Sequence, residues 1–230
     1  MRLVLFDIDG TLLNSEGVGK ASMQSALTNV FGAPGDPKYR YDGKTDRQIV
    51  RDTMRLEGHN DEHIDSRMNQ LIDHYLGGLR ERIAGGNFRV RPLAGVMEIL
   101  DALEAREDVI LGLLTGNVEP GARIKLKAAG IDPDRFRVNA FGSDHEHRPE
   151  LPAIAQRRAS ESLGLDITGD RIVVIGDTPA DIQCGRSLGA KSIGVASGHY
   201  TVEQLLEHDP YAVLESLADT PKVLETIVNA

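Results

Sequence analysis

Two carboxylates separated by one residue follow the first apolar run of the chain. Asp7 and Asp9 come directly after "LVLF" (3–6). Two later apolar runs also end in polar clusters, which are "TGN" (115–117) and "GDTPAD" (176–181). Carboxylates, hydroxyls and amides can bind hard cations and oxyanions, and carboxylates can also act as nucleophiles or proton donors. The three clusters predict one reactive site if the fold brings them together.

The runs that precede these clusters have the pattern of strands in a parallel sheet. "RLVLF" (2–6), "VILGLL" (109–114) and "RIVVIG" (171–176) are almost continuously apolar, as is typical of strands buried on both faces. Shorter candidate strands lie at 137–141, 191–196 and 211–215, and helical patterns lie at 93–106, 119–130 and 151–164. The alternation predicts an α/β fold with a Rossmann-like, doubly wound parallel sheet.

The carboxyl ends of parallel strands meet at one edge of the sheet, where ligands bind. Asp7, Asp9 and Asp177 should therefore share one site, with Thr115 and Asn117 beside them. Three neighbouring carboxylates raise each other's pKa unless a cation neutralises them. The expected cation is Mg²⁺, which favours a few carboxylates together with waters and phosphate oxygens.

The "GDTPAD" cluster also carries the signals of a helix start. Thr178 suits an N-cap, and Pro179 suits the first helical position. Asp181 then lies in the first turn, where the helix dipole favours an acid. The segment is a well-capped helix, and in the functional interpretation Asp177 is also a metal ligand while Asp181 holds water bound to that metal.

Residues 15–90 interrupt the alternation of strands and helices. They contain no clear strand, and apolar residues recur at helical spacing from Ile64 to Ile83. We therefore predict two domains. Residues 1–14 and 91–230 form the α/β core, and residues 15–90 form an all-helical insert after the first strand.

Composition and charge disfavour several classes of function. The chain has 230 residues and a formal net charge of −9, which disfavours non-specific binding to nucleic acid. No apolar run is long enough for a signal peptide or a membrane span, and the single Cys184 cannot form an internal disulfide. We expect a soluble cytoplasmic protein without nucleic-acid or membrane partners. The sequence leaves the oligomeric state open.

The motifs "FDIDGTL", "LTGN" and "GDTPAD", in this order, resemble those of the haloacid dehalogenase-like phosphatase superfamily. The helical insert resembles the type-1 cap of that superfamily. The resemblance implies that Asp7 is the nucleophile that becomes an aspartyl-phosphate. It also implies that Asp9 protonates the leaving oxygen and then activates water.

The same resemblance implies the groups that bind the phosphoryl oxygens and the metal. The phosphoryl oxygens would be held by Thr115, Gly116 and Asn117. Mg²⁺ would be bound by Asp7, Asp177 and the backbone carbonyl of Asp9. The residue types agree with this chemistry, because a carboxylate can attack phosphorus. A second acid two residues further along an extended strand points to the same side as the first.

In one respect this sequence departs from the pattern of the superfamily. Members of the superfamily usually have a lysine at the start of a helix between the second and third motifs, and no lysine stands at that place here. Lys125 and Lys127 lie too close to "TGN" within a helical pattern to take that place. Arg148, followed by proline, stands where Lys-Pro is frequent in the superfamily. Arginine can neutralise both phosphate and a carboxylate. We therefore predict Arg148 as the catalytic cation, with Arg157 and Arg158 as alternatives.

Within the insert, "YDGKTDRQIV" (41–50) resembles the cap loop that faces the active site in phosphoglycolate phosphatase-like members. Gly43 favours a turn, and Thr45 can cap a following helix. Gly43 and Lys44 are therefore candidate substrate-binding residues, with the Lys44 ammonium facing a second anionic group. The alternative is a turn and a helix cap with a solvated lysine.

The leading interpretation is a Mg²⁺-dependent phosphatase of a small phosphorylated metabolite, with phosphoglycolate as the first candidate. A sugar phosphomutase can be built on the same core and is the alternative. A dehalogenase is disfavoured because that branch lacks the second acid. A non-catalytic binding protein would be expected to lack Asp7 or Asp9, and both are present.

Overall fold

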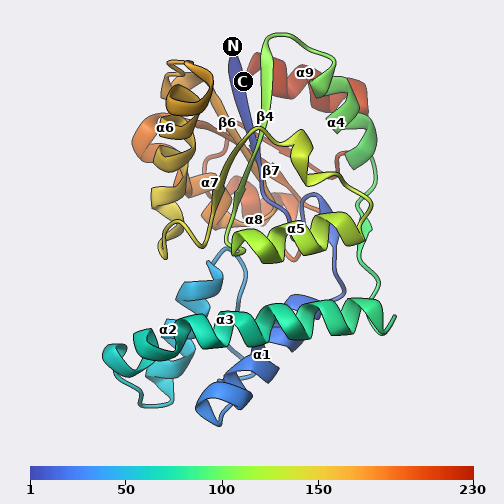
Figure 1. Ribbon diagram of the computed structural model, residues 1–230. Helices are drawn as coiled ribbons and strands as arrows, with labels where there is room; N and C mark the ends of the chain where they lie inside the picture. The colour runs from blue at the N-terminus through green and yellow to red at the C-terminus, as the bar shows by residue number, and fades with distance from the viewer.

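A six-stranded parallel sheet forms the centre of the larger part of the molecule in the computed structural model, which describes residues 1–230 (Figure 1). The strands are β1 (Arg2–Phe6), β4 (Val109–Thr115), β5 (Val138–Phe141), β6 (Ile172–Gly176), β7 (Lys191–Val195) and β8 (Ala212–Leu214). Their order is β5-β4-β1-β6-β7-β8, and every neighbouring pair is parallel. The predicted α/β fold with a doubly wound sheet is confirmed.

Helices cover both faces of this sheet. One face packs against α4 (Val96–Glu104), α5 (Glu119–Ala128) and α9 (Thr220–Asn229), and the other against α6 (Leu151–Leu163) and α7 (Pro179–Cys184). Val4 and Phe6 of β1 belong to the first hydrophobic cluster, whereas Leu3 and Leu5 belong to the second. Alternate residues of β1 thus enter opposite cores, which is why the strand has no polar face. The short α8 (Val202–Leu206) packs beside β7 and β8.

The insert between β1 and β4 is helical, with α1 (Val18–Phe31), α2 (Asp46–Leu56) and α3 (Asp61–Ala84). These helices enclose a hydrophobic cluster of 15 buried residues, all of which belong to the insert except Val118 of the core. β2 (Leu13–Asn14) and β3 (Arg91–Pro92) pair antiparallel where the chain enters and leaves this region. The domain boundaries that we predict at residues 15 and 90 lie next to this pair. Neither α3 nor any other helix combines the length and the apolar character needed to cross a membrane.

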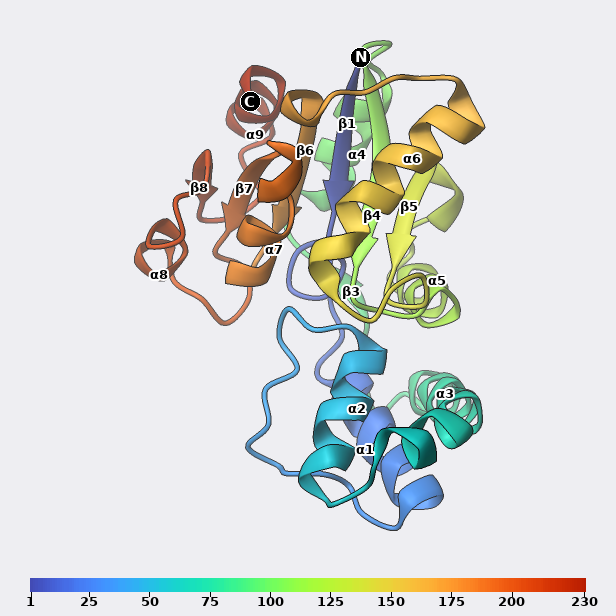
Figure 2. The same cartoon turned by 90° about the vertical axis from the view of Figure 1, so that its left-hand side faces the viewer.

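The sheet points its carboxyl ends toward the helical insert, as the arrowheads in Figure 2 show. On one side of β1 lie β4 and then β5, and on the other side lie β6, β7 and β8 in that order. The order therefore reverses between β1 and β6. In open parallel sheets this reversal is where ligands bind, so the loops after β1 and β6 should form the site.

Candidate active site

Three buried aspartates form a compact cluster at the reversal of the sheet. Asp7 follows β1, Asp177 follows β6, and Asp181 lies on α7. A carboxylate oxygen from each lies within 4.8 Å of the other two, and the exposed fractions are 6%, 4% and 1%. Gly10 lets the Asp177 carboxylate lie against the loop that follows β1, because a Cβ atom at its position would lie 2.3 Å from Asp177 Oδ2. Its φ of +84° also favours glycine.

The first turn of α7 fixes one member of this cluster. Thr178 is the N-cap, and the backbone N–H of Asp181 donates to the Thr178 hydroxyl. In return the Asp181 carboxylate accepts a hydrogen bond from the backbone N–H of Thr178 at 3.0 Å. This is a capping box, so the predicted N-cap is confirmed. The cap orients Asp181 toward Asp7 and Asp177, and its role in holding metal-bound water stays a prediction.

Arg148 supplies the positive charge at the aspartate cluster. It lies just before α6 and is 4% exposed. Its Nη2 atom lies 3.1 Å from Asp7 Oδ1, contacts the Asp181 carboxylate and donates to the carbonyl oxygen of Leu114 at 3.2 Å. A single nitrogen of this side chain therefore contacts the predicted nucleophile and its neighbour.

The two alternative arginines of α6 face elsewhere. Arg157 is exposed and lies 3.8 Å from Glu161 on the same helix. Arg158 forms an ion pair with Asp144 at 2.7 Å. Of the three arginines that the sequence left open, Arg148 is the one that contacts the aspartate cluster.

Burial and mutual repulsion set the charge state of the aspartate cluster. Burial raises the pKa of Asp7, the charge of Arg148 opposes that rise, and the charge of Asp181 adds to it. Burial also raises the pKa of Asp177, and the charges of Asp181 and Asp7 raise it further. One arginine thus does not neutralise three acids. The donors are carboxylate oxygens only, which fits a hard divalent cation.

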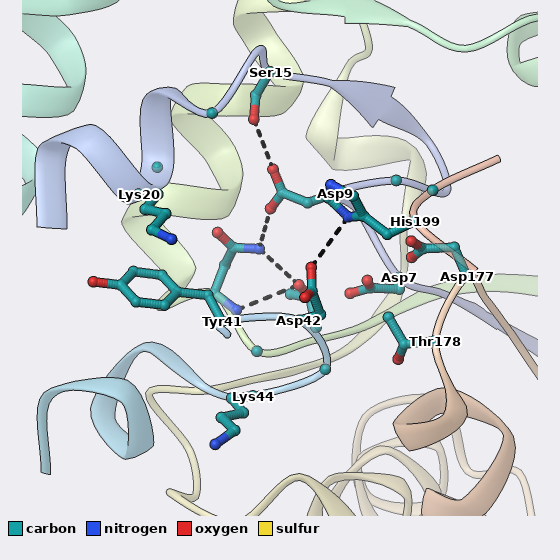
Figure 3. A pocket seen from close by; sticks show the side chains of 18 of the residues that line it. Asp7, Asp9, Ser15, Lys20, Tyr41, Asp42, Lys44, Asp177, Thr178 and His199 are labelled. Atoms are coloured by element: carbon teal, nitrogen blue, oxygen red, sulfur yellow. Dashed lines mark hydrogen bonds and ion pairs between the residues drawn. The ribbon is translucent and has the colours of Figure 1, made fainter. Parts of the chain in front are cut away.

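Asp9 does not join the aspartate cluster, although it lies only two residues from Asp7. Its Oδ1 accepts a hydrogen bond from Ser15 Oγ at 3.0 Å (Figure 3). Its Oδ2 accepts from Asn117 Nδ2 at 2.9 Å and from Lys125 Nζ at 2.6 Å. Burial alone would raise the pKa of Asp9, but the charge of Lys125 and these hydrogen bonds lower it below its ordinary value. The sequence prediction that both acids project from an extended strand is wrong, because β1 ends at Phe6 and the chain turns.

Lys125 is the site residue that the sequence reasoning missed. Its closeness to "TGN" argues against the place of the usual lysine, and it makes no contact with Asp7, yet its ammonium contacts Asp9. The sequence did carry a signal. Lys125 stands on the inner face of α5, where Gly121, Ala122 and Leu126 are the other buried residues. A lysine at such a position in the helix that follows "TGN" predicts a buried partner of opposite charge.

Thr115 and Asn117 are linked at the end of β4. The Thr115 hydroxyl oxygen accepts a hydrogen bond from Asn117 Nδ2 at 2.9 Å, and neither side chain is exposed beyond 7%. Because the Thr115 oxygen is an acceptor in this bond, its own hydrogen can be donated to a ligand. This geometry suits a hydroxyl that holds an anion oxygen.

The segment from Gly43 to Asp46 brings the helical insert into direct contact with the core. The backbone N–H of Asp46 donates to the carbonyl oxygen of Gly116 at 2.8 Å, and the Asp46 carboxylate accepts from the N–H of Val118 at 2.8 Å. Burial raises the pKa of Asp46 to about 6, although the charge of Lys125 opposes the rise. A Cβ atom at Gly116 would lie 2.0 Å from the carbonyl oxygen of Lys44. Gly116 therefore permits the insert to lie closed on the core.

A cavity of about 710 Å³ lies between the insert and the core, and Asp7, Asp9, Lys20, Lys44 and Arg148 all line it. The Lys44 ammonium is 2.6 Å from Tyr39 Oη and 3.6 Å from Asp52 Oδ2, and it points away from Asp7 (Figure 3).

Lys20 of α1 lies on another side of this cavity. Its ammonium donates to the carbonyl oxygen of Pro37 at 3.3 Å and lies 5.3 Å from the centre of the Tyr41 ring, without a carboxylate partner. The structure thus offers a second lysine beside the predicted Lys44, and both stay candidates for contact with a substrate anion.

Comparisons with known proteins give the family of the chain and relatives of its fold. The sequence profile described as haloacid dehalogenase-like hydrolase matches residues 4–195. The chain is 27% identical over 236 residues to a phosphoglycolate phosphatase from Agrobacterium fabrum, covering 99% of this chain and 94% of that protein. It is 28% identical to a 5'-nucleotidase from Pseudomonas aeruginosa, covering 97% and 95%. A crystal structure of a hydrolase from Pseudomonas syringae shares the fold, with a TM-score of 0.74 at 23% identity over 99% of each chain.

Proposed function

We propose that this chain, which belongs to the haloacid dehalogenase-like hydrolase family and is a phosphoric monoester hydrolase, depends on Mg²⁺ and uses Asp7 as its nucleophile. It acts on small phosphorylated substrates. The observation that carries the proposal is the buried cluster of Asp7, Asp177 and Asp181 beside Arg148. A nucleophilic carboxylate, an all-oxygen metal site and a fixed cation meet there, as phosphoryl transfer requires.

In the first step an Asp7 carboxylate oxygen attacks phosphorus as the bond from phosphorus to the leaving oxygen breaks. Catalysis of this step is mainly positioning and charge stabilisation. Arg148 lies beside the attacking carboxylate, and the Thr115 hydroxyl can donate to a phosphoryl oxygen. Gly116 and Asn117 follow on the same loop, and their backbone N–H groups are the remaining proposed donors.

Asp9 serves both steps in this proposal. It donates a proton to the leaving oxygen, and it then accepts a proton from the water that hydrolyses the aspartyl-phosphate. Its carboxylate lines the same cavity as Asp7 but belongs to a different hydrogen-bond network. The separation supports two different roles for the two acids.

The metal site is proposed from the donor set. We infer that Asp7, Asp177 and the backbone carbonyl of Asp9 hold Mg²⁺, and that Asp181 orients water in its shell. Three buried acids beside one arginine leave a negative charge that a divalent ion would offset. When bound, Mg²⁺ supplies charge stabilisation for the phosphoryl oxygens.

We propose a small acidic phosphoester as the substrate, with phosphoglycolate as the first compound to test. Two lysines of the insert, Lys20 and Lys44, line the cavity and can meet a second anionic group. The Agrobacterium fabrum relative named above supports the same compound, and the Pseudomonas aeruginosa relative makes a nucleoside 5'-monophosphate the natural comparison.

The test is a substrate panel assayed with Mg²⁺ and with EDTA. It comprises phosphoglycolate, a nucleoside 5'-monophosphate, glucose 6-phosphate and p-nitrophenyl phosphate. We expect activity only with Mg²⁺, the highest kcat/KM with phosphoglycolate, and none from folded Asp7→Asn protein. Undiminished turnover in EDTA would contradict the metal proposal. A preference for the neutral sugar phosphate would contradict the acidic substrate.

A further inference from the structure

We propose that Lys125 is a positioning residue that fixes the orientation of the Asp9 carboxylate for proton transfer. The inference rests on the proposed function, in which Asp9 is the acid and the base. It adds a buried cation from α5 that serves Asp9 and makes no contact with the aspartate cluster at Asp7.

Three side chains form a closed hydrogen-bonded triangle. Lys125 Nζ lies 2.6 Å from Asp9 Oδ2 and 2.7 Å from Asn117 Oδ1. Asn117 Nδ2 donates to the same Asp9 oxygen at 2.9 Å. Each member therefore contacts the other two. With Ser15 Oγ on the other carboxylate oxygen, the Asp9 side chain is held at both oxygens.

Packing alone does not explain a lysine at this position. Lys125 is 4% exposed and stands among the apolar residues of the inner face of α5, where an apolar side chain would avoid the desolvation of an ammonium. Lys127, two residues further along α5, is exposed to solvent. Gly19 of α1 leaves room for the ammonium, because it has no side chain. A Cβ atom at this position would lie only 3.1 Å from Lys125 Nζ. The buried charge is accounted for by its hydrogen bonds to Asp9 and Asn117, and it also acts on the buried Asp46 carboxylate.

A fixed carboxylate matters because proton transfer requires a defined geometry between the acid and the leaving oxygen. Without the ammonium, Asp9 Oδ2 keeps only the Asn117 amide, and Asn117 Oδ1 loses its donor. The triangle opens and Asp9 gains rotational freedom. Asp7 and its contact with Arg148 are not part of this network.

The test compares substrates whose leaving groups do and do not need a proton. The variants are Lys125→Met, which removes the charge, and Lys125→Gln, which can still donate a hydrogen bond to Asp9. Lys127→Met on the same helix is the matched control. For an alkyl phosphate, kcat/KM should fall roughly tenfold to hundredfold in Lys125→Met, within the contribution of general acid catalysis, and less in Lys125→Gln. For p-nitrophenyl phosphate it should stay within about threefold, because nitrophenolate leaves without a proton.

A second measurement separates the two chemical steps. With p-nitrophenyl phosphate, an Asp7 oxygen forms its bond to phosphorus as the bond to nitrophenolate breaks, and Asp9 is not needed. Hydrolysis of the aspartyl-phosphate still requires Asp9 to accept a proton from water. Lys125→Met should therefore release a burst of nitrophenol close to one equivalent per enzyme before a slower steady state. Lys127→Met should behave like the wild type in both measurements.

Equal losses on both substrates without a burst would overturn the inference, because a residue that only stabilises the fold would act in that way. Urea unfolding identifies variants that do not fold, and should Lys125→Met be one of them, the same comparison in Lys125→Gln decides. A wild-type protein that hydrolyses none of the phosphoesters would overturn the proposed function together with this inference. An active wild type with uniform losses in the variants would overturn the role of Lys125 alone.

Discussion

Substitution of Arg148 tests how the aspartate cluster is neutralised, and the structure sets different expectations for lysine and for alanine. The Nη2 atom alone contacts Asp7, Asp181 and the carbonyl oxygen of Leu114, whereas the buried Nε atom has no partner. A lysine ammonium carries three N–H donors on one nitrogen, which matches three acceptors. Its side chain is shorter by one atom. We expect kcat/KM of Arg148→Lys to stay within about tenfold of the wild type, or about 1.4 kcal/mol.

Arg148→Ala should be far more damaging. It leaves Asp7 and Asp181 buried without their cation, and breaking a buried ion pair lowers the free energy of unfolding by about 3–5 kcal/mol. It also removes the fixed charge beside Asp7, where the proposed mechanism places the transferred phosphoryl group. Loss of one such group lowers kcat by roughly a hundredfold to a thousandfold.

The assay combines urea unfolding with kcat for phosphoglycolate and p-nitrophenyl phosphate at saturating Mg²⁺. Arg157→Ala and Arg158→Ala, in the helix that follows Arg148, are the controls. Arg157 is exposed, so neither quantity should change. Arg158→Ala loses the ion pair with Asp144 and should cost about 1 kcal/mol of stability with kcat retained. A control that lowers kcat more than Arg148→Ala would refute the assignment, and equal losses in Arg148→Lys and Arg148→Ala would refute the single-nitrogen argument.

Three further predictions address the metal, the substrate and the pH dependence of stability. Asp177→Ala should weaken Mg²⁺ binding, and a titration of kcat with Mg²⁺ should restore part of the lost activity at high Mg²⁺. A loss of activity that no Mg²⁺ concentration reverses would contradict the role of Asp177 as a metal ligand. Lys44→Ala should raise KM for phosphoglycolate roughly tenfold, about 1.4 kcal/mol for one charge contact, and change KM for p-nitrophenyl phosphate far less. Lys20→Ala is its matched comparison, and the lysine with the larger selective effect is the one that meets the second anion. Because burial raises the pKa of Asp7 and Asp177 above 3.8, the metal-free fold binds more protons than the unfolded chain at neutral pH. Its free energy of unfolding should therefore fall as the pH rises from about 4 toward 8, and Mg²⁺ should raise the melting temperature more at pH 8 than at pH 5; an equal rise at both would argue against the cluster as the metal site.

The central strands of the sheet were predictable because β1, β4 and β6 are buried on both faces. The run 109–114 corresponds to β4 (Val109–Thr115), and the run 171–176 corresponds to β6 (Ile172–Gly176). Continuous apolar runs between polar loops report that burial directly. The cap at Thr178 was predictable for a different reason, since a capping box depends only on residues three apart.

The partners of the buried charges were not predictable in the same way. Lys125 and Asp9 are separated by 116 residues, and no local pattern states that α5 carries a lysine to the turn after β1. The sequence likewise left three arginines open, because Arg148 precedes α6 and Arg157 and Arg158 lie within it, and no local pattern says which of them faces the aspartates. Asp46 lies on the insert yet is buried by the core, so its environment exists only when the two parts meet. Sequence patterns report what a segment buries, whereas these contacts depend on how segments are placed.

The structure also explains how two acids only two residues apart lie in different surroundings, as their different proposed roles require. The chain turns after β1, so the Asp7 carboxylate meets the groups that follow β6 while the Asp9 carboxylate meets those that follow β4. Each acid then has its own cation. Arg148 reaches Asp7 from the start of α6, and Lys125 reaches Asp9 from α5, which lies on the opposite face of the sheet. A metal bound at Asp7 and Asp177, as proposed, would therefore not compete with Lys125 for the Asp9 carboxylate. The proposed nucleophile and the proposed proton carrier are each paired with a cation from a different part of the chain.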